Sequence, residues 1–240
     1  MLIEVNGLHK SFRGHVAVND ASFSIESPTI VGLLGSNGAG KSTTMRIMAG
    51  ILKPDSGEVR IAGHDILNER LSAQSHLGYL PEAASGFSNM TAAEFLEFAA
   101  SAHGIKKSGR KSAVQNVIDR LDLSSITRAT LGTLSKGWRQ RVWLGQALIH
   151  NPSVLILDEP TDGLDPNQKL VLRQLLRDVA QTTAIIMSTH ILEEAENLCE
   201  QVIVMNDGGI VANLPKQDLL DKNGRLATAI LDLTTSEVEP

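Results

Sequence analysis

A glycine-rich segment that ends in a lysine and a serine is the clearest site of chemistry in the sequence. Residues 35–42 read Gly-Ser-Asn-Gly-Ala-Gly-Lys-Ser and match the pattern G-x-x-x-x-G-K-[ST]. Glycines let the backbone curl so that successive N–H groups point at phosphate oxygens, and a helix N-terminus behind the loop adds to the attraction for anions. Lys41 is expected to bridge the β- and γ-phosphates of a nucleotide, and the Ser42 hydroxyl to bind Mg²⁺. The predicted binding residues of this segment are Gly35, Ser36, Asn37, Gly38, Ala39, Gly40, Lys41, Ser42 and Thr43.

Two adjacent acidic residues form the second candidate site. Asp158 and Glu159 follow the apolar run Val154–Leu157, and ligands in open parallel sheets bind at the carboxyl ends of the strands. Two neighbouring carboxylates are costly there unless a positive group lies nearby. Adjacent residues on a strand point to opposite faces, so we assign Asp158 to the coordination shell of Mg²⁺ and Glu159 to general base for an attacking water. The alternative is an acidic strand end that caps a turn before Pro160, and the phosphate segment makes this alternative the weaker one.

The segments around these residues predict an α/β core. Short runs that are apolar on both faces are what a buried parallel sheet requires, and segments that alternate in polarity predict strands with one face in water. The apolar runs are Ile30–Leu34, Val154–Leu157, Ala184–Met187 and Val202–Met205. Alternation occurs at residues 3–5, 22–25 and 59–61. The sequence therefore predicts parallel core strands with a peripheral antiparallel region.

The middle of the chain has a helical pattern instead. Thr91 and Glu94 have the spacing of a capping box. The apolar face predicted behind it consists of Phe95, Phe98, Ala99 and Ala102. A second helical stripe in this region covers residues 114–121. A further stripe at residues 171–179 lies between two of the apolar core runs, and Pro166 sits where that helix begins. An all-helical insertion is therefore expected between the core strands.

The composition limits the class of protein. The chain has 240 residues, of which 42% are hydrophobic, and this composition suits a folded domain. Its formal net charge of −5 argues against the basic surface of a free-standing nucleic-acid binder. Its longest stretch without a formal charge, Val142–Leu157, is too short and too polar to span a bilayer. The N-terminus has no leader-like pattern, and the single cysteine, Cys199, fits a reducing compartment. We therefore expect a cytosolic protein without a nucleic-acid partner.

A third motif indicates a family. Residues 134–141, Leu-Ser-Lys-Gly-Trp-Arg-Gln-Arg, resemble the signature motif of ATP-binding cassette (ABC) ATPases, usually written LSGGQ-x-x-R. Phe12 resembles the family's adenine-stacking aromatic, residues 79–82 its Q-loop region, residues 162–165 its D-loop and His190 its switch histidine. The motif wording is most similar to cassettes of exporters whose membrane subunits are separate chains, including the gliding-motility and the drug and sodium efflux branch.

The resemblance implies a role for each matching residue. Residues 135–137 would contact the nucleotide held by a second subunit, and Asp165 would lie at the dimer seam while also capping a helix. His190 would contact the γ-phosphate, and Glu82 would meet the metal or its water. Lys136 departs from the family pattern by replacing a glycine, and Glu82 by standing where glutamine is more common. The residues expected to bind nucleotide through these motifs are Phe12, Glu82, Ser135, Lys136, Gly137 and Asp165.

The expected fold class is α/β: a P-loop NTPase core with a mixed, mostly parallel sheet, a peripheral antiparallel β-subdomain and an inserted α-helical subdomain. The ABC ATPase domain would cover residues 1–222, with the helical subdomain at about residues 91–150. The tail at residues 223–240 is weakly patterned and ends in acidic residues. We expect this tail to be loosely held or cut short from something longer.

The resemblance implies an ATPase that serves a transporter, most similar to exporters. Two cassettes would sandwich two ATP molecules with Mg²⁺ and drive a separate integral-membrane permease at the cytoplasmic face of the cell membrane. The helical insertion would dock on the permease, with residues 82–95 as its hinge. Soluble ABC ATPases of ribosomes or DNA carry two cassettes or a long coiled coil, which this sequence lacks, and a P-loop GTPase or kinase would leave residues 134–141 unexplained. The sequence leaves open the substrate, the direction of transport and whether the two cassettes are identical or different chains.

Overall fold

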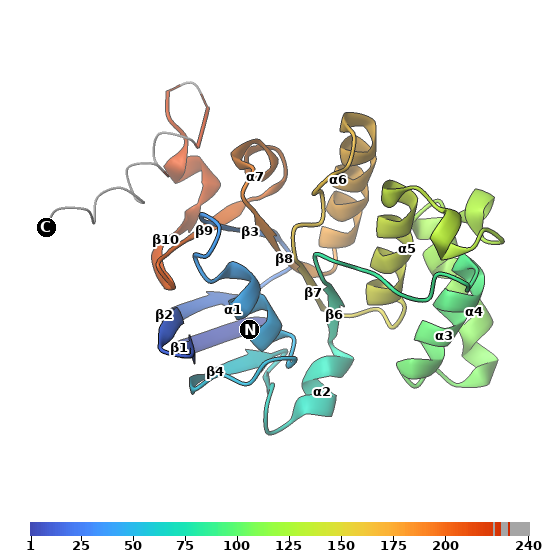
Figure 1. Cartoon of the computed structure of the whole chain (residues 1–240), viewed down its shortest axis with the longest axis horizontal. Helices are drawn as coiled ribbons and strands as arrows, with labels where there is room; N and C mark the ends of the chain where they lie inside the picture. The colour runs from blue at the N-terminus through green and yellow to red at the C-terminus, as the bar shows by residue number, and fades with distance from the viewer. Residues whose placement is uncertain (223, 227–229, 231–240) are drawn as a thin grey trace, which may run out of the picture.

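The computed structural model describes residues 1–222, 224–226 and 230, which form two sheets with helices packed around them (Figure 1). The larger sheet has the strand order β10-β9-β3-β8-β7-β6. Its strands are β3 (Ile30–Leu34), β6 (Leu77–Leu80), β7 (Val154–Leu157), β8 (Ala184–Thr189), β9 (Gln201–Asn206) and β10 (Gly209–Pro215). Neighbours from β9 to β6 run parallel, and β10 pairs antiparallel with β9. The predicted mixed, mostly parallel core sheet is confirmed; most of the predicted tail at 223–240 lies outside the described residues.

The smaller sheet is antiparallel and has the order β2-β1-β4-β5. Its strands are β1 (Ile3–Phe12), β2 (His15–Ile25), β4 (Ser56–Ile61) and β5 (His64–Asp65). Ile3 and Val5 are fully buried and lie opposite Ile25 and Phe23 of β2. The polar residues between them face the other side of the sheet, so the predicted peripheral antiparallel region is also confirmed.

The six-stranded sheet is buried on both faces because successive side chains of a strand point to opposite sides. In β7, Leu155 and Leu157 belong to one apolar cluster, whereas Val154 and Ile156 belong to another. The first cluster continues into the helices α3, α5 and α6, and the second continues into α1 and the small sheet. This two-sided burial explains why the core strands are apolar at every position.

Seven α-helices surround the sheets in the described part of the chain. They are α1 (Lys41–Met48), α2 (Arg70–Ser75), α3 (Ala92–Ala102), α4 (Lys107–Arg120), α5 (Lys136–Leu148), α6 (Pro166–Ala180) and α7 (Leu192–Leu198), with 3₁₀ segments at 124–126, 131–133 and 216–219. Helices α3, α4 and α5 pack against one another beside the core, on the right of Figure 1, and form the expected helical insertion. Among the helices described, none is long and apolar enough to cross a membrane.

Helix α3 begins as predicted, and of its predicted buried face Phe95 and Ala99 are buried while the other two residues are not. The backbone N–H of Thr91 donates to Glu94 Oε2 at 2.8 Å, and the N–H of Glu94 donates to Thr91 Oγ1 at 3.2 Å, which forms the capping box. The prediction that Phe98 and Ala102 lie on the buried face is wrong, because both are exposed. Phe98 packs on Phe87 at the surface, with ring centroids 5.2 Å apart. The buried residues of α3 are Ala92, Phe95, Leu96, Ala99 and Ala100.

Candidate functional site

The predicted phosphate loop joins β3 to α1 at the carboxyl edge of the six-stranded sheet. Gly40 precedes α1 with a φ of 102°, and a Cβ at this position would overlap the carbonyl oxygen of Ala17. A Cβ at Gly35 would overlap the carbonyl oxygen of Met205 in the same way. Only glycine fits these positions. No side chain caps the N-terminus of α1 within the described chain, so this end of the helix is suited to an anion.

Lys41 lies across the loop that precedes it. Its Nζ donates to the carbonyl oxygens of Gly35 at 2.8 Å and Ser36 at 3.0 Å, and only 6% of the residue is exposed. Burial lowers the pKa of Lys41 from its ordinary value, whereas the carboxylates of Glu159, Asp158 and Glu82 act in the opposite direction. The ammonium group is therefore held at the centre of an acidic site.

Asp158 directly follows β7 and is 1% exposed. Its Oδ1 accepts hydrogen bonds from Ser42 Oγ at 3.0 Å and from Ser188 Oγ at 2.7 Å. Its Oδ2 is buried and has no hydrogen-bond partner among the described residues. Because an unpaired buried carboxylate oxygen is costly, this atom is suited to a cation or to the water bound to one.

Glu159 is held by its backbone as well as by its side chain. It has a φ of 47°, in the left-handed region that non-glycine residues rarely adopt. Its N–H donates to Ser188 Oγ at 2.8 Å, and its Oε2 lies 3.1 Å from His190 Nδ1. The argument from strand alternation is wrong, because β7 ends at Leu157 and both acids lie beyond it. The left-handed backbone at Glu159 is what gives the two acids different directions.

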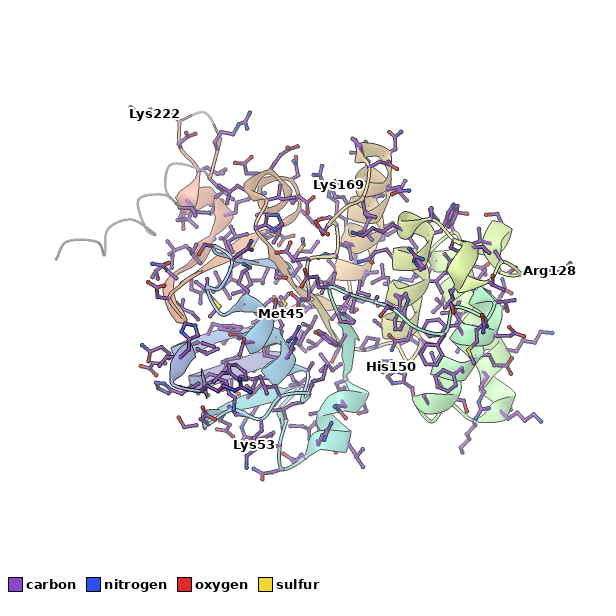
Figure 2. All side chains as sticks on the ribbon, viewed as in Figure 1. Met45, Lys53, Arg128, His150, Lys169 and Lys222 are labelled. Atoms are coloured by element: carbon purple, nitrogen blue, oxygen red, sulfur yellow. The ribbon has the colours of Figure 1, made fainter. Side chains whose placement is uncertain are left out.

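The turn that follows Glu159 is held in place by Glu194, which also forms an ion pair with Lys169. Glu194 of α7 is 1% exposed and accepts a hydrogen bond from Thr161 Oγ1. Its other oxygen accepts from Lys169 Nζ of α6 at 2.7 Å; Figure 2 labels this lysine. A buried carboxylate needs such partners, and the network fixes the turn to two helices.

Lys41, Ser42 and Glu159 meet in a pocket of about 290 Å³, and Asp158 lies outside its lining, bonded to Ser42. The pocket is lined by Ala17, Asn37, Gly38, Gly40, Lys41, Ser42, Thr43, Glu82, Glu159, Asp162 and His190. Phe12 is not among them: it lies at the end of β1, is 44% exposed and has Lys10 Nζ 5.5 Å from its ring centre. With this exposure, Phe12 is not part of the hydrophobic core.

Residues 135–137 of the predicted signature motif lie outside this pocket. Ser135 caps α5 by accepting the N–H of Trp138 at 3.4 Å, and Lys136 Nζ lies 3.1 Å from Asp162 Oδ2. Lys136 borders a neighbouring groove that shares Glu82 and Asp162 with the phosphate pocket. A Cβ at Gly137 would crowd the Gln168 side chain. Asp165 also lies outside the pocket, where it caps α6 through a capping box with Gln168.

Two residues of the site were not predicted. Ser188 follows the apolar run of β8 as Asp158 follows that of β7, and the preceding residues Leu157 and Met187 are paired in the sheet. A polar residue directly after the apolar run of a buried parallel strand is the signal that would have found Ser188. Asp162 lies within the D-loop motif, but only Asp165 of that motif was assigned a role.

Comparisons with known proteins agree with this geometry. The chain matches the family model described as ABC transporter over residues 18–162. The uncharacterized ABC transporter ATP-binding protein YxlF of Bacillus subtilis (strain 168) is 38% identical over 209 residues, which cover 87% of this chain and 69% of that protein. The bacitracin transport ATP-binding protein BcrA of Bacillus licheniformis is 34% identical over 224 residues, with coverage of 92% and 72%. A solved ATP binding subunit of an ABC transporter is similar with a TM-score of 0.86 and 27% identity, over 97% of this chain and 99% of that one. The chain therefore belongs to the ABC transporter family of ATP-binding proteins, which hydrolyse ATP to power transport.

Proposed function

We propose that this chain is the ATP-hydrolysing subunit of an exporter, and that two cassettes close on two MgATP molecules to drive a separate permease. One observation carries the proposal. Within the described part of the chain, the buried Oδ2 of Asp158 has no hydrogen-bond partner, while Oδ1 of the same carboxylate accepts a hydrogen bond from Ser42 in the phosphate pocket. A carboxylate oxygen that can bind a cation, next to a loop that can bind phosphate, is the arrangement that a metal–nucleotide complex requires.

The chain's residues fit the phosphates of ATP. Gly35 and Gly40 let the loop lie against the backbone of Met205 and Ala17, and a Cβ at Gly38, which lines the pocket, would meet nothing within 4 Å. The loop is therefore held in place and its backbone N–H groups are open to phosphate oxygens. Lys41 already donates to two carbonyl groups of the loop, and a phosphate oxygen would replace these acceptors with a charged one. Phe12 is exposed at the end of β1, where an adenine ring can stack on it.

The same site fits Mg²⁺. Ser42 Oγ and Asp158 Oδ1 are 3.0 Å apart, and both are the hard oxygen ligands that Mg²⁺ prefers. Glu82 lines the pocket and is placed to meet the ion or its water. When bound, Mg²⁺ supplies neutralisation of the charge on the β- and γ-phosphates.

Hydrolysis is assigned to Glu159 with His190 beside it. Glu159 lines the pocket, and its carboxylate is positioned to accept a proton from water that attacks the γ-phosphate. His190 Nδ1 lies 3.1 Å from Glu159 Oε2 and orients the carboxylate. His190 lines the same pocket, so its ring is also placed to contact the γ-phosphate.

Residues 135–137 support a composite site between two chains. Ser135 and Gly137 do not line the phosphate pocket of their own chain, and Lys136 borders only the neighbouring groove. The N-terminus of α5, which these residues begin, is suited to an anion supplied from elsewhere. A second cassette carrying ATP in its own pocket is the proposed source.

A groove between the core and the helical insertion is proposed as the permease site. It has a volume of about 890 Å³ and combines residues that follow α1, residues of α2 and residues near the end of α3. Ile51 and Leu71 are 60% and 85% exposed beside it. Figure 2 labels His150, which lies between α2 and the helical insertion. Docking there would place the chain at the cytoplasmic face of the membrane.

Substitution of Glu159 by glutamine tests the assignment of the general base. The glutamine keeps the shape and can still bond to His190, but it cannot accept a proton. We expect MgATP binding to persist, hydrolysis to slow by about 100-fold or more, and an ATP-dependent dimer to accumulate on a sizing column. Glu97→Gln removes the same charge from the exposed face of α3 and is the matched control. Hydrolysis within a few-fold of the parent would mean that the base lies elsewhere, with His190 as the leading candidate.

Leu71→Asp tests the permease site. The substitution puts a charge into the apolar groove and should release the chain from washed membranes of cells that express the permease, while MgATP binding is retained. Leu170→Asp is the control, because Leu170 is also exposed (61%) but belongs to α6, away from the groove. Equal membrane recovery of both variants would refute docking at this groove.

A further inference from the structure

Two charged residues at the edge of the phosphate pocket form an ion pair that has no role in the chemistry proposed above. Lys136 Nζ donates to Asp162 Oδ2 at 3.1 Å. Lys136 is the first residue of α5, and Asp162 belongs to the turn after Glu159, where its N–H donates to the Glu159 carbonyl at 3.2 Å. The pair therefore connects the signature helix to the turn that carries the proposed general base.

The backbone makes room for this contact. Gly163 has a φ of 63°, and a Cβ at this position would overlap Lys136 Nζ and crowd the carbons behind it. The lysine side chain thus lies directly against the turn, where Gly163 leaves room for it. Because the atoms in contact are the end of a flexible side chain, the lysine can also move away from the turn.

Asp162 occupies the boundary between two sites. It lines the phosphate pocket together with Glu82 and Glu159, and it lines the groove that Lys136 borders. Lys136 does not line the phosphate pocket itself. The ammonium group is therefore held just outside its own chain's pocket, on the face where the α5 N-terminus is suited to an anion from a second chain.

We propose that Asp162 holds Lys136 back in the nucleotide-free chain and releases it to the γ-phosphate of ATP carried by a second copy, so that the ion pair acts as a latch on ATP-driven association. The proposal rests on the proposed function, because it requires two cassettes to share their sites. When the latch opens, Lys136 exchanges a carboxylate acceptor for a phosphate acceptor, and no covalent bond is made or broken.

The exposure of the pair suits this exchange. The side chains of Lys136 and Asp162 are 49% and 52% exposed, and ion pairs in such positions contribute little to stability. A lysine carries three donors on a flexible stem and can turn to a new anion readily. Removing Asp162 should therefore make Lys136 more available, whereas removing Lys136 should take away the contact itself.

A double-mutant cycle in the Glu159→Gln background tests the latch. Sedimentation equilibrium with MgATP gives the dimer dissociation constant of the background protein, of Asp162→Asn, of Lys136→Met and of the double variant. If each released pair contributes about 2- to 5-fold, the two pairs of a dimer lower the dissociation constant by about 4- to 25-fold in Asp162→Asn. Lys136→Met should raise the constant, and Asp162→Asn should change it by less than about 2-fold when Lys136 is already absent.

The possible results separate the explanations. An equal gain from Asp162→Asn with and without Lys136 would show a general effect of removing negative charge, and it would overturn the latch. Weaker association in Asp162→Asn would overturn it as well, because the pair would then support the assembled form. A background protein that does not associate with MgATP at all would refute the shared site of the proposed function, and the latch with it. With MgADP, which lacks the γ-phosphate, the four proteins should not differ, and a difference would contradict the proposed acceptor.

Discussion

Replacement of Ser188 by alanine tests whether a buried residue behind the pocket controls its chemistry. The Ser188 hydroxyl donates to Asp158 Oδ1 at 2.7 Å and accepts the N–H of Glu159 at 2.8 Å. The side chain is fully buried. One oxygen atom therefore positions both the proposed metal ligand and the proposed general base.

The hydrogen bonds give the size of the expected effects. A buried N–H that loses its partner costs about 1–3 kcal/mol, which for a chain of this length lowers the midpoint of thermal unfolding by roughly 2–12 °C. Glu159 has a φ of 47°, a conformation that costs on the order of 1–3 kcal/mol, so without the bond to Ser188 its backbone is free to relax. A displacement of about 1 Å at a reacting group costs about 100-fold in rate. We therefore expect kcat for ATP hydrolysis to fall about 10- to 100-fold, with a much smaller change in KM.

Steady-state ATP hydrolysis and thermal unfolding measure the two effects separately. Thr183→Val is the matched control, because the buried Thr183 hydroxyl donates to the Pro152 carbonyl at 3.2 Å at the opposite end of β8. The control should lose stability and keep its kcat. If Ser188→Ala keeps kcat within about 2-fold of the parent, the hydroxyl serves the fold alone and the positioning argument is refuted.

Three further predictions concern single ionisable residues. Lys41→Met should weaken MgATP binding by about 10- to 100-fold in calorimetry and leave the fold intact, so unchanged affinity would exclude this lysine from the phosphate site. Burial, more than the neighbouring His103, lowers the pKa of His150 to about 4. The unfolded chain therefore binds the extra proton first, and the free energy of unfolding should decline as the pH falls from about 6.5 to about 4. His150→Gln should flatten this decline in urea titrations, while substitution of the exposed His15 should not. Burial raises the pKa of Cys199 to about 12, so a thiol reagent at pH 8 should modify the unfolded chain and not the native one; rapid labelling of the native protein would contradict this burial.

The core sheet was predictable because its physical requirement is local. A parallel strand covered on both faces needs apolar residues at every position, and the runs at β3, β7, β8 and β9 meet this requirement. The buried face of α3 was less predictable, because several faces of that helix are apolar. Phe98 stays partly exposed, and its ring packs on Phe87, which comes from the preceding loop and is also partly exposed. Helical periodicity does not describe a contact with a residue outside the helix.

The candidate site divides in the same way. The phosphate loop is a local pattern, and Lys41 contacts neighbours in sequence. The close approaches that require Gly35 and Gly40 come from Met205 and Ala17, which lie far from the loop in sequence. The hydrogen bond of Ser42 to Asp158 joins residues 116 positions apart. The sequence assigned both residues to Mg²⁺ but did not predict this direct contact. Neither Ser188 nor the left-handed backbone at Glu159 could be expected from strand alternation, because the strand ends before the two acids. The order of neighbouring strands in the sheet is what brings them together.

The distribution of charge explains why metal and partner should act on this site at different stages. The lining of the phosphate pocket contains the carboxylates of Glu82, Glu159 and Asp162, and Lys41 is its one lysine or arginine among the described residues. Phosphates that enter a single chain therefore meet a surplus of negative charge, which a divalent cation at Asp158 would reduce. The next ammonium group, on Lys136, is paired with Asp162 and lies outside the lining of this pocket. We therefore expect ATP binding to one chain to depend on Mg²⁺, and the closed, hydrolytic state to depend on the second chain that accepts the released lysine.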